Sequence, residues 1–179
     1  MTMHRDLLLN KITDILGTTD DSYEAKLVSM CDDAKRIFIT GAGRSKLVGN
    51  FLGMRLMHSG YTVYVQGEIS TPSIREGDLL VVISGSGETT QLVSFANKAK
   101  SEGAKVVLIC SKSSSTIGDL ADQTIRIGSD DSFTPTKGMP MGTMFELSTL
   151  IFLEAIVSHL IHEKGIPEEQ MKYRHANME

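Results

Sequence analysis

Short apolar runs alternate with amphipathic segments along most of the chain. Five of these runs have the length and the β-branched content of buried strands, and the segments between them repeat apolar residues at helical spacing. The predicted strands are RIFIT (36–40), YTVYV (61–65), LLVVI (79–83), VVLIC (106–110) and QTIRI (123–127). Short strands that alternate with helices favour a parallel sheet covered on both faces, so the predicted fold class is α/β.

The helical segments complete this alternation. The predicted helices cover residues 1–16, 23–31, 46–58, 88–100 and about 141–164, with a short helical turn at 117–121. Residues 128–142 carry two of the four prolines and no periodicity, so they are predicted to form a loop. We expect one domain over residues 1–179, with an N-terminal helical segment (1–34) and a C-terminal tail (165–179).

Composition and charge exclude several classes of protein. The net charge is -4 and no basic stripe is visible, which argues against a nucleic-acid-binding surface. Cys31 and Cys110 lie far apart without CxxC spacing, which is typical of free thiols in a cytoplasmic protein. The N-terminal segment is amphipathic and unlike a signal peptide, and no apolar run approaches the length of a membrane span.

Two turns rich in glycine and hydroxyl residues follow predicted strands. TGAGRS (40–45) and SGSGET (84–89) lie where a parallel sheet binds ligands, beyond the carboxyl ends of its strands. Glycines there allow close approach of the backbone, and the following helices present free N–H groups to an anion. The turns therefore predict a phosphate cradle without a metal, formed by Gly43, Arg44, Ser45, Ser84, Gly85, Ser86, Gly87, Glu88 and Thr89.

Each turn also has a simpler interpretation. GAGRSK has Lys46 where the third glycine of a dinucleotide fingerprint would stand, so it could be an ordinary strand-to-helix turn. SGSGET could be a helix cap, with Glu88 favoured by the helix dipole. The two turns together are the stronger signal, because one sheet would bring them side by side. A P-loop is excluded, since no GxxxxGK[ST] occurs.

The motifs ITGAGRS, VVISGSGETT and PMGTMFE, with the closing RHANME, resemble the sugar isomerase (SIS) domain family and, within it, the 6-phospho-3-hexuloisomerases. The resemblance covers essentially the whole chain. It implies a flavodoxin-like three-layer α/β/α sandwich with a five-stranded parallel sheet, and a homotetramer. It also implies conversion of D-arabino-hex-3-ulose 6-phosphate to D-fructose 6-phosphate in the ribulose monophosphate route of formaldehyde fixation.

Moving a carbonyl from C3 to C2 requires one base that takes the C2 proton and returns a proton to C3 through a cis-enediol. Donors must lie near the enediolate oxygens, and no cofactor or metal is needed if they do. The resemblance indicates Glu146 as the base, in an apolar setting at the start of the last long helix. The alternative is a surface glutamate favoured by the helix dipole, with Glu88 or Glu154 as the base.

His175 is the second catalytic candidate. The resemblance implies that such a tail histidine acts at a neighbouring subunit's site, where it could shuttle a proton to a sugar oxygen or open a cyclic form. The alternative is a frayed chain end.

Arg44 is favoured over Lys137 as the cation that neutralises the phosphate. His159 and His162 do not form an HExxH motif, and no metal site is expected.

The predicted partners are a sugar phosphate and further copies of the chain. Apolar residues wrap most of the way round the segment 150–161, which implies burial on more than one side and hence an interface. A non-catalytic phosphosugar-binding module is the competing class, but the presence of both Glu146 and His175 favours an enzyme. An isomerase for arabinose 5-phosphate or sedoheptulose 7-phosphate is a further alternative.

Overall fold

The computed structural model describes residues 2–129 and 131–178 and contains a sheet of five parallel strands. Their order across the sheet is β2-β1-β3-β4-β5. The strands are β1 (Ile37–Gly41), β2 (Val63–Val65), β3 (Leu79–Ile83), β4 (Lys105–Cys110) and β5 (Gln123–Arg126). Each coincides with a predicted run, so the predicted α/β class is confirmed.

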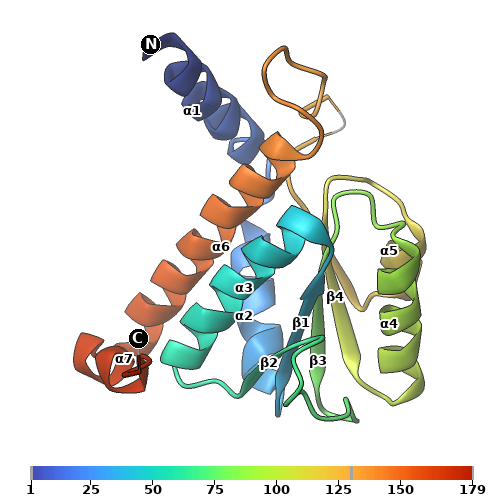
Figure 1. Cartoon of the computed structure of the whole chain (residues 1–179), viewed down its shortest axis with the longest axis vertical. Helices are drawn as coiled ribbons and strands as arrows, with labels where there is room; N and C mark the ends of the chain where they lie inside the picture. Colours follow the sequence, from blue (N-terminus) through green and yellow to red (C-terminus); the bar gives the residue numbers. More distant parts are fainter. Residues whose placement is uncertain (1, 130, 179) are drawn as a thin grey trace.

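Helices cover both faces of the sheet (Figure 1). One face packs against α2 (Ser22–Asp33), α3 (Gly43–His58) and α6 (Thr143–Lys164), with α1 (Thr2–Leu16) packed against α6. The other face packs against α4 (Thr90–Ser101) and α5 (Thr116–Leu120). Successive strand residues point to opposite faces, which is why the buried residues of β3 divide between two apolar cores. The predicted three-layer flavodoxin-like sandwich is confirmed.

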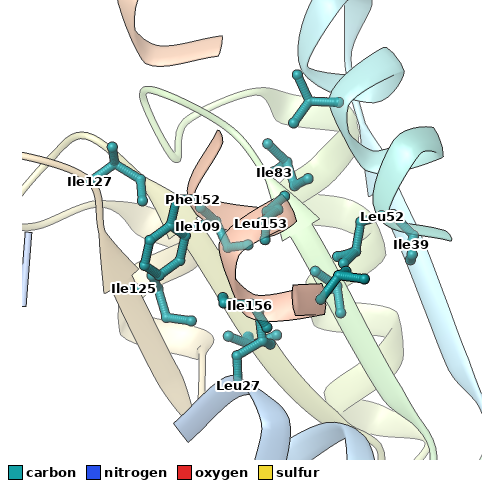
Figure 2. Close-up of a cluster of buried hydrophobic side chains, with 14 of the residues drawn as sticks. Leu27, Ile39, Leu52, Ile83, Ile109, Ile125, Ile127, Phe152, Leu153 and Ile156 are labelled. Carbon is teal, nitrogen blue, oxygen red and sulfur yellow. The ribbon is translucent and has the colours of Figure 1, made fainter. Parts of the chain in front are cut away.

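The larger core lies between the sheet and the long helices (Figure 2). Side chains from α2, α3 and α6 meet isoleucines of β1, β3, β4 and β5 there. Leu27, Leu52 and Ile156 are each 2% exposed or less. This packing fixes where α3 and α6 begin, and therefore where their first turns lie relative to the ends of the strands.

Strand order reverses between β1 and β3. From β1 the chain crosses through α3 to β2 on one side, and all later strands lie on the other side. Gly41, the last residue of β1, is in register with Ile83, the last residue of β3. Ligands bind outside the carboxyl ends of the strands at such a switch point.

Several boundaries differ from the sequence prediction. α3 begins three residues earlier than predicted, so Gly43, Arg44 and Ser45 form its first turn rather than a free loop. The tail is not wholly irregular, because Glu168–Arg174 form a further helix, α7. Pro167 precedes this helix and two glutamates lie in its first turn, and both features are typical of a helix start. The helix was not predicted from the sequence, because seven residues are too few to show a helical periodicity.

Our prediction that no apolar run approaches a membrane span is not supported by α6. Within the described residues, α6 alone is long and apolar enough to cross a membrane by length and composition, with a mean hydropathy of 1.6 over its most apolar window. Half of that window is buried inside the fold. The helix packs against α1, α2 and α3, as the core helix of an α/β protein does.

Candidate active site

The two glycine-rich turns lie side by side at the switch point, as the sequence predicts. Gly41 leads through Ala42 into α3, and Ile83 leads through residues 84–89 into α4. Gly41 allows this tight turn, because a Cβ there would lie 2.9 Å from the backbone nitrogen of Lys46. Both helices begin beside the same edge of the sheet, so their first N–H groups lack intrahelical acceptors there. This arrangement suits an anion such as a phosphate.

The hydroxyl oxygens of Ser84 and Ser86 accept hydrogen bonds from backbone N–H groups of the same loop. The N–H of Gly87 donates to Ser84 Oγ at 3.1 Å, and the N–H of Glu88 donates to Ser86 Oγ at 3.2 Å. Each hydroxyl oxygen is therefore used as an acceptor, which leaves its own hydrogen available for an anion. Thr89 is the N-cap residue of α4, but its side chain makes no capping hydrogen bond in the described chain.

Gly87 allows the loop to pass close to α5. Its φ is +67°, and a Cβ at this position would lie 2.2 Å from Ser115 Oγ. Ser115 Oγ in turn accepts a hydrogen bond from the N–H of Gly118. The hydroxyl of Ser111 donates to the carbonyl of Gly85 at 2.8 Å. The loop between β3 and α4 is therefore fixed by contacts to the segment after β4.

Glu88 has a structural role in this network. Its Oε1 accepts from the N–H of Thr116 at 2.8 Å and its Oε2 accepts from the Thr116 hydroxyl at 2.7 Å. These two bonds lower the pKa of the Glu88 carboxyl. Both carboxylate oxygens hold the start of α5, so Glu88 contributes to the cradle by fixing the loop.

Glu146 lies beside this cradle in the first turn of α6. Its N–H donates to the carbonyl of Gly142 at 2.9 Å, and its side chain is 13% exposed. Glu146 Oε2 accepts a hydrogen bond from Nε of Arg44 in the first turn of α3. The neighbouring Phe145 ring packs on Gly85, where an added Cβ would lie 3.1 Å from the ring. Glu146, Arg44 and the loop between β3 and α4 therefore lie together at this edge of the sheet.

The structure separates the alternative carboxylates. Glu154 lies eight residues after Glu146 on α6, about 12 Å along the helix. Its carboxylate pairs with Arg55 at 3.6 Å and is 40% exposed.

Arg44, which we predicted to contact the phosphate, is 61% exposed and is paired with Glu146. Lys137 lies in the loop before α6, in the lining of a cavity of about 440 Å³.

His175 does not join Glu146 within one chain. Nη1 of Arg174 donates to the carbonyl of His58 at 3.2 Å, and the His175 ring stacks on the His58 ring with centroids 5.2 Å apart. His58 ends α3, whereas Arg44 begins it, and the two are about 21 Å apart along the helix. The C-terminus accordingly lies at the end of α3 and α6 opposite to the cradle (Figure 1). A role for His175 in its own chain's site is not compatible with this position.

Sequence reasoning missed three residues that position the site: Phe145, Ser111 and Thr116. The carbonyl of Gly85 accepts from Ser111, and Thr116 holds Glu88. The SKSSST stretch after the predicted strand VVLIC is a further hydroxyl-rich turn at a strand end, and it could have indicated both Ser111 and Thr116. Within the described residues, no group of three His, Cys, Asp or Glu side chains could hold a metal ion.

A sheet of this order, with glycine-rich turns and helix N-termini at its switch point and a carboxylate beside them, is typical of α/β proteins that bind a small anionic ligand. Residues 30–156 match the family model of the SIS domain. A 3-hexulose-6-phosphate isomerase of Methylomonas aminofaciens is 49% identical over 100% of both chains. A protein of the same name from Bacillus subtilis is 39% identical over 96% of this chain and 95% of its own.

Solved structures agree with these relatives. A protein of Methanococcus jannaschii, whose structure infers a molecular function of 3-hexulose-6-phosphate isomerase, superposes with a TM-score of 0.88. It is 34% identical and the match covers 99% of both chains. The chain therefore belongs to the SIS domain family and, within it, to the family of the 3-hexulose-6-phosphate isomerases.

Proposed function

We propose that this protein is an isomerase that interconverts D-arabino-hex-3-ulose 6-phosphate and D-fructose 6-phosphate through a cis-enediol. The observation that carries the proposal is the position of Glu146, a largely buried carboxylate beside a phosphate cradle. A base next to an anion site suits proton transfer on a small phosphorylated sugar. The names of the similar full-length relatives support the same substrate.

Glu146 is the proposed base. Its carboxylate takes the proton from C2, and the electrons of that C–H bond form the C2=C3 double bond. The C3 carbonyl electrons move to O3, which is protonated to give the enediol. The O2 proton then leaves, and Glu146 returns its proton to C3. Arg44 supports this transfer, because its guanidinium holds the Glu146 carboxylate in place and can donate to an enediolate oxygen.

The cradle holds the substrate phosphate in this proposal. Ser84, Ser86 and Thr89 donate hydroxyl hydrogen bonds from one turn, and Ser45 donates from the first turn of α3. The N-termini of α3 and α4 direct their positive dipole ends at the same anion. Phosphate binding therefore fixes C2 and C3 near Glu146 without taking part in the proton transfer.

His175 is proposed to act at the site of a neighbouring subunit, where its imidazole would carry the proton between O2 and O3 or open a cyclic form. This requires a homo-oligomer, which we propose to be a tetramer. We also propose that the enzyme is cytoplasmic and serves formaldehyde fixation by the ribulose monophosphate route. The buried thiols of Cys31 and Cys110, which are free, are compatible with a reducing compartment.

The test is a coupled assay in which purified protein receives hexulose 6-phosphate and fructose 6-phosphate formation is followed. Arabinose 5-phosphate and sedoheptulose 7-phosphate are the comparison substrates at equal concentration. The proposal predicts a kcat/KM for hexulose 6-phosphate far above that for the other two sugars. Preference for either alternative sugar, or binding of all three without turnover, would overturn it.

A further inference from the structure

Residues 140–143 form the turn that leads into α6, and its glycine does not stand where the backbone favours one. The second residue of the turn, Met141, has φ +49° and is the one non-glycine residue with a positive φ among residues 2–129 and 131–178. The third residue, Gly142, has φ -80° and ψ 6°, which alanine can also adopt. A turn with a positive φ at its second residue favours glycine at that position. The conformation of Gly142 therefore does not explain why it is a glycine.

The side chain of Met141 does not explain its own conformation either, because it is 99% exposed. The turn is closed by Thr143, whose N–H and hydroxyl both donate to the carbonyl of Pro140, at 3.2 Å and 2.7 Å. A non-glycine residue in the left-handed region is strained and persists where its surroundings determine the conformation, often at functional sites. The chain keeps a glycine at position 142 and accepts this strain at position 141.

Gly142 lies directly against the side chain of Glu146. A Cβ added to Gly142 would lie 3.0 Å from Oε1, 3.4 Å from Cδ and 3.8 Å from Cγ of Glu146. The first of these distances is shorter than the optimal separation of two non-bonded heavy atoms, which is about 3.5 Å. Space for the carboxylate is therefore what glycine provides at this position and what alanine would remove.

The two oxygens of Glu146 are held by different elements. Oε2 accepts a hydrogen bond from Nε of Arg44 in α3, whereas Oε1 lies against Gly142, the N-cap residue of α6. Because glycine has no side chain that could cap the first turn, the positive end of the helix dipole remains available to the carboxylate. A contact that pushes Oε1 away would therefore move the whole carboxylate relative to Arg44.

We infer that Gly142 is a positioning residue for Glu146, because its lack of a side chain allows the carboxylate to fold back over the N-terminus of α6. The inference rests on the proposed function for the use of Glu146 as the base. That base must reach both C2 and C3 of the bound sugar, and a displacement of about 1 Å at a reacting group can cost about a hundredfold in rate. An alanine at position 142 displaces the carboxylate by about 0.5 Å, so a loss of about tenfold is expected.

The first test is Gly142→Ala in the full chain. The kcat should fall by about tenfold, while KM stays within about twofold of the wild type because the proposed cradle is unchanged. Met141→Gly is the matched control, since it relieves the positive φ in the same turn and adds no atom near Glu146. Its kcat should stay within about twofold of the wild type. An unchanged kcat in Gly142→Ala would overturn the inference.

A variant that exchanges the two residues separates position from strain. The double variant Met141→Gly, Gly142→Ala places the glycine where the turn favours it and the Cβ where the carboxylate lies. Its urea midpoint should be at least that of Gly142→Ala, and its kcat should still be reduced by about tenfold. Recovery of the wild-type kcat would show that strain in the turn caused the loss, and it would overturn the inference. Because the exchange relaxes the turn, it provides the test even if Gly142→Ala folds poorly.

The route of the effect is tested in the Glu146→Gln background. If Gly142 acts through the base, adding Gly142→Ala to Glu146→Gln should cause no further loss of the residual kcat. A further loss of about tenfold in this background would mean that Gly142 acts by another route, and it would contradict the positioning role.

The position of the carboxylate can also be followed without substrate. The Nε–H signal of Arg44 in nitrogen–proton NMR spectra, identified by its loss in Arg44→Lys, should shift in Gly142→Ala and stay in place in Met141→Gly. If it shifts as expected but the wild-type protein converts no hexulose 6-phosphate, the positioning role stands and the proposed activity fails. If the protein is active and neither this signal nor kcat responds to Gly142→Ala, the activity stands and the positioning role fails.

Discussion

Arg44 and Glu146 form an ion pair that joins the first turn of α3 to the first turn of α6. The two residues are 102 positions apart in the sequence and meet because both helices pack on the same face of the sheet. The carboxylate is 13% exposed and the guanidinium is 61% exposed, so the cation shields Glu146 from the solvent side. In our account Arg44 holds the base in position beside the proposed phosphate cradle.

The first prediction concerns the cradle. Thr89→Val removes one hydroxyl from the N-cap position of α4 while keeping the shape of the side chain. Loss of a hydrogen bond to a charged phosphate costs about 1.5–3 kcal/mol, which corresponds to roughly a 10- to 150-fold increase in KM. The kcat should change little, because the phosphate contact is the same in the ground and transition states. A drop in kcat at unchanged KM, measured by steady-state kinetics, would refute this role.

Gly87 is predicted to be essential for loop stability. Gly87→Ala adds a Cβ at φ +67° that would lie 2.2 Å from Ser115 Oγ, so we expect a loss of about 3 kcal/mol or more in the free energy of unfolding. Gly43→Ala is the control, because Gly43 has φ +54° but nothing within 4 Å of an added Cβ. That change should cost about 1 kcal/mol. Urea titrations that give equal losses for both would contradict the proposed close approach.

The interaction between Glu88 and Thr116 predicts a pH dependence of stability. Because folding lowers the pKa of Glu88, its contribution is fully present above the unfolded-state pKa and is lost as the pH falls through the folded-state value. The difference in Tm between wild type and Glu88→Gln should therefore be greatest above the unfolded-state pKa of about 4.3 and should shrink as the pH falls below it. A difference that grows on acidification would have the wrong sign.

Metal removal provides a further test. The proposed proton transfer uses only protein side chains, so activity should survive prolonged chelation with EDTA followed by desalting. An activity that is lost and then restored by one divalent ion would require a different account of how the enediolate is stabilised.

The sequence was most informative where residues act locally. The run LLVVI matches β3 residue for residue, because a buried strand between turn residues is a local pattern. The two glycine-rich turns were also predicted to meet, since the ends of parallel strands share one edge of the sheet. Glu146 and His175 were indicated by resemblance, because a glutamate at a helix start carries no local signal for catalysis.

Long-range relationships were not predictable in the same way. The pairing of Arg44 with Glu146 depends on how α3 and α6 pack, and the use of Glu88 by Thr116 depends on the segment after β4. The helix α7 is only seven residues long, and its docking on the end of α3 depends on a contact between Arg174 and His58. None of these pairs is close in sequence, so periodicity and local motifs could not reveal them.

The role of the base is tested by Glu146→Gln. Loss of a general acid–base group should lower kcat by about two to four decades, while the near-isosteric amide leaves folding almost unchanged. Glu154→Gln is the matched control, because Glu154 lies on the same helix, is 40% exposed and pairs with Arg55. The control should retain kcat within about a few-fold of the wild type. Equal losses in both variants would indicate damage to α6 rather than loss of the base.

The most direct measurement is exchange of the substrate C2 proton with solvent in D₂O, followed by NMR. Wild type and Glu154→Gln should incorporate deuterium during turnover, because the proton that Glu146 takes from C2 exchanges with solvent deuterium while the enediol exists. Glu146→Gln should show no exchange above the uncatalysed background, although the substrate still binds. Exchange at the wild-type rate in Glu146→Gln would show that another group removes the C2 proton, and it would contradict the assignment of Glu146 as the base.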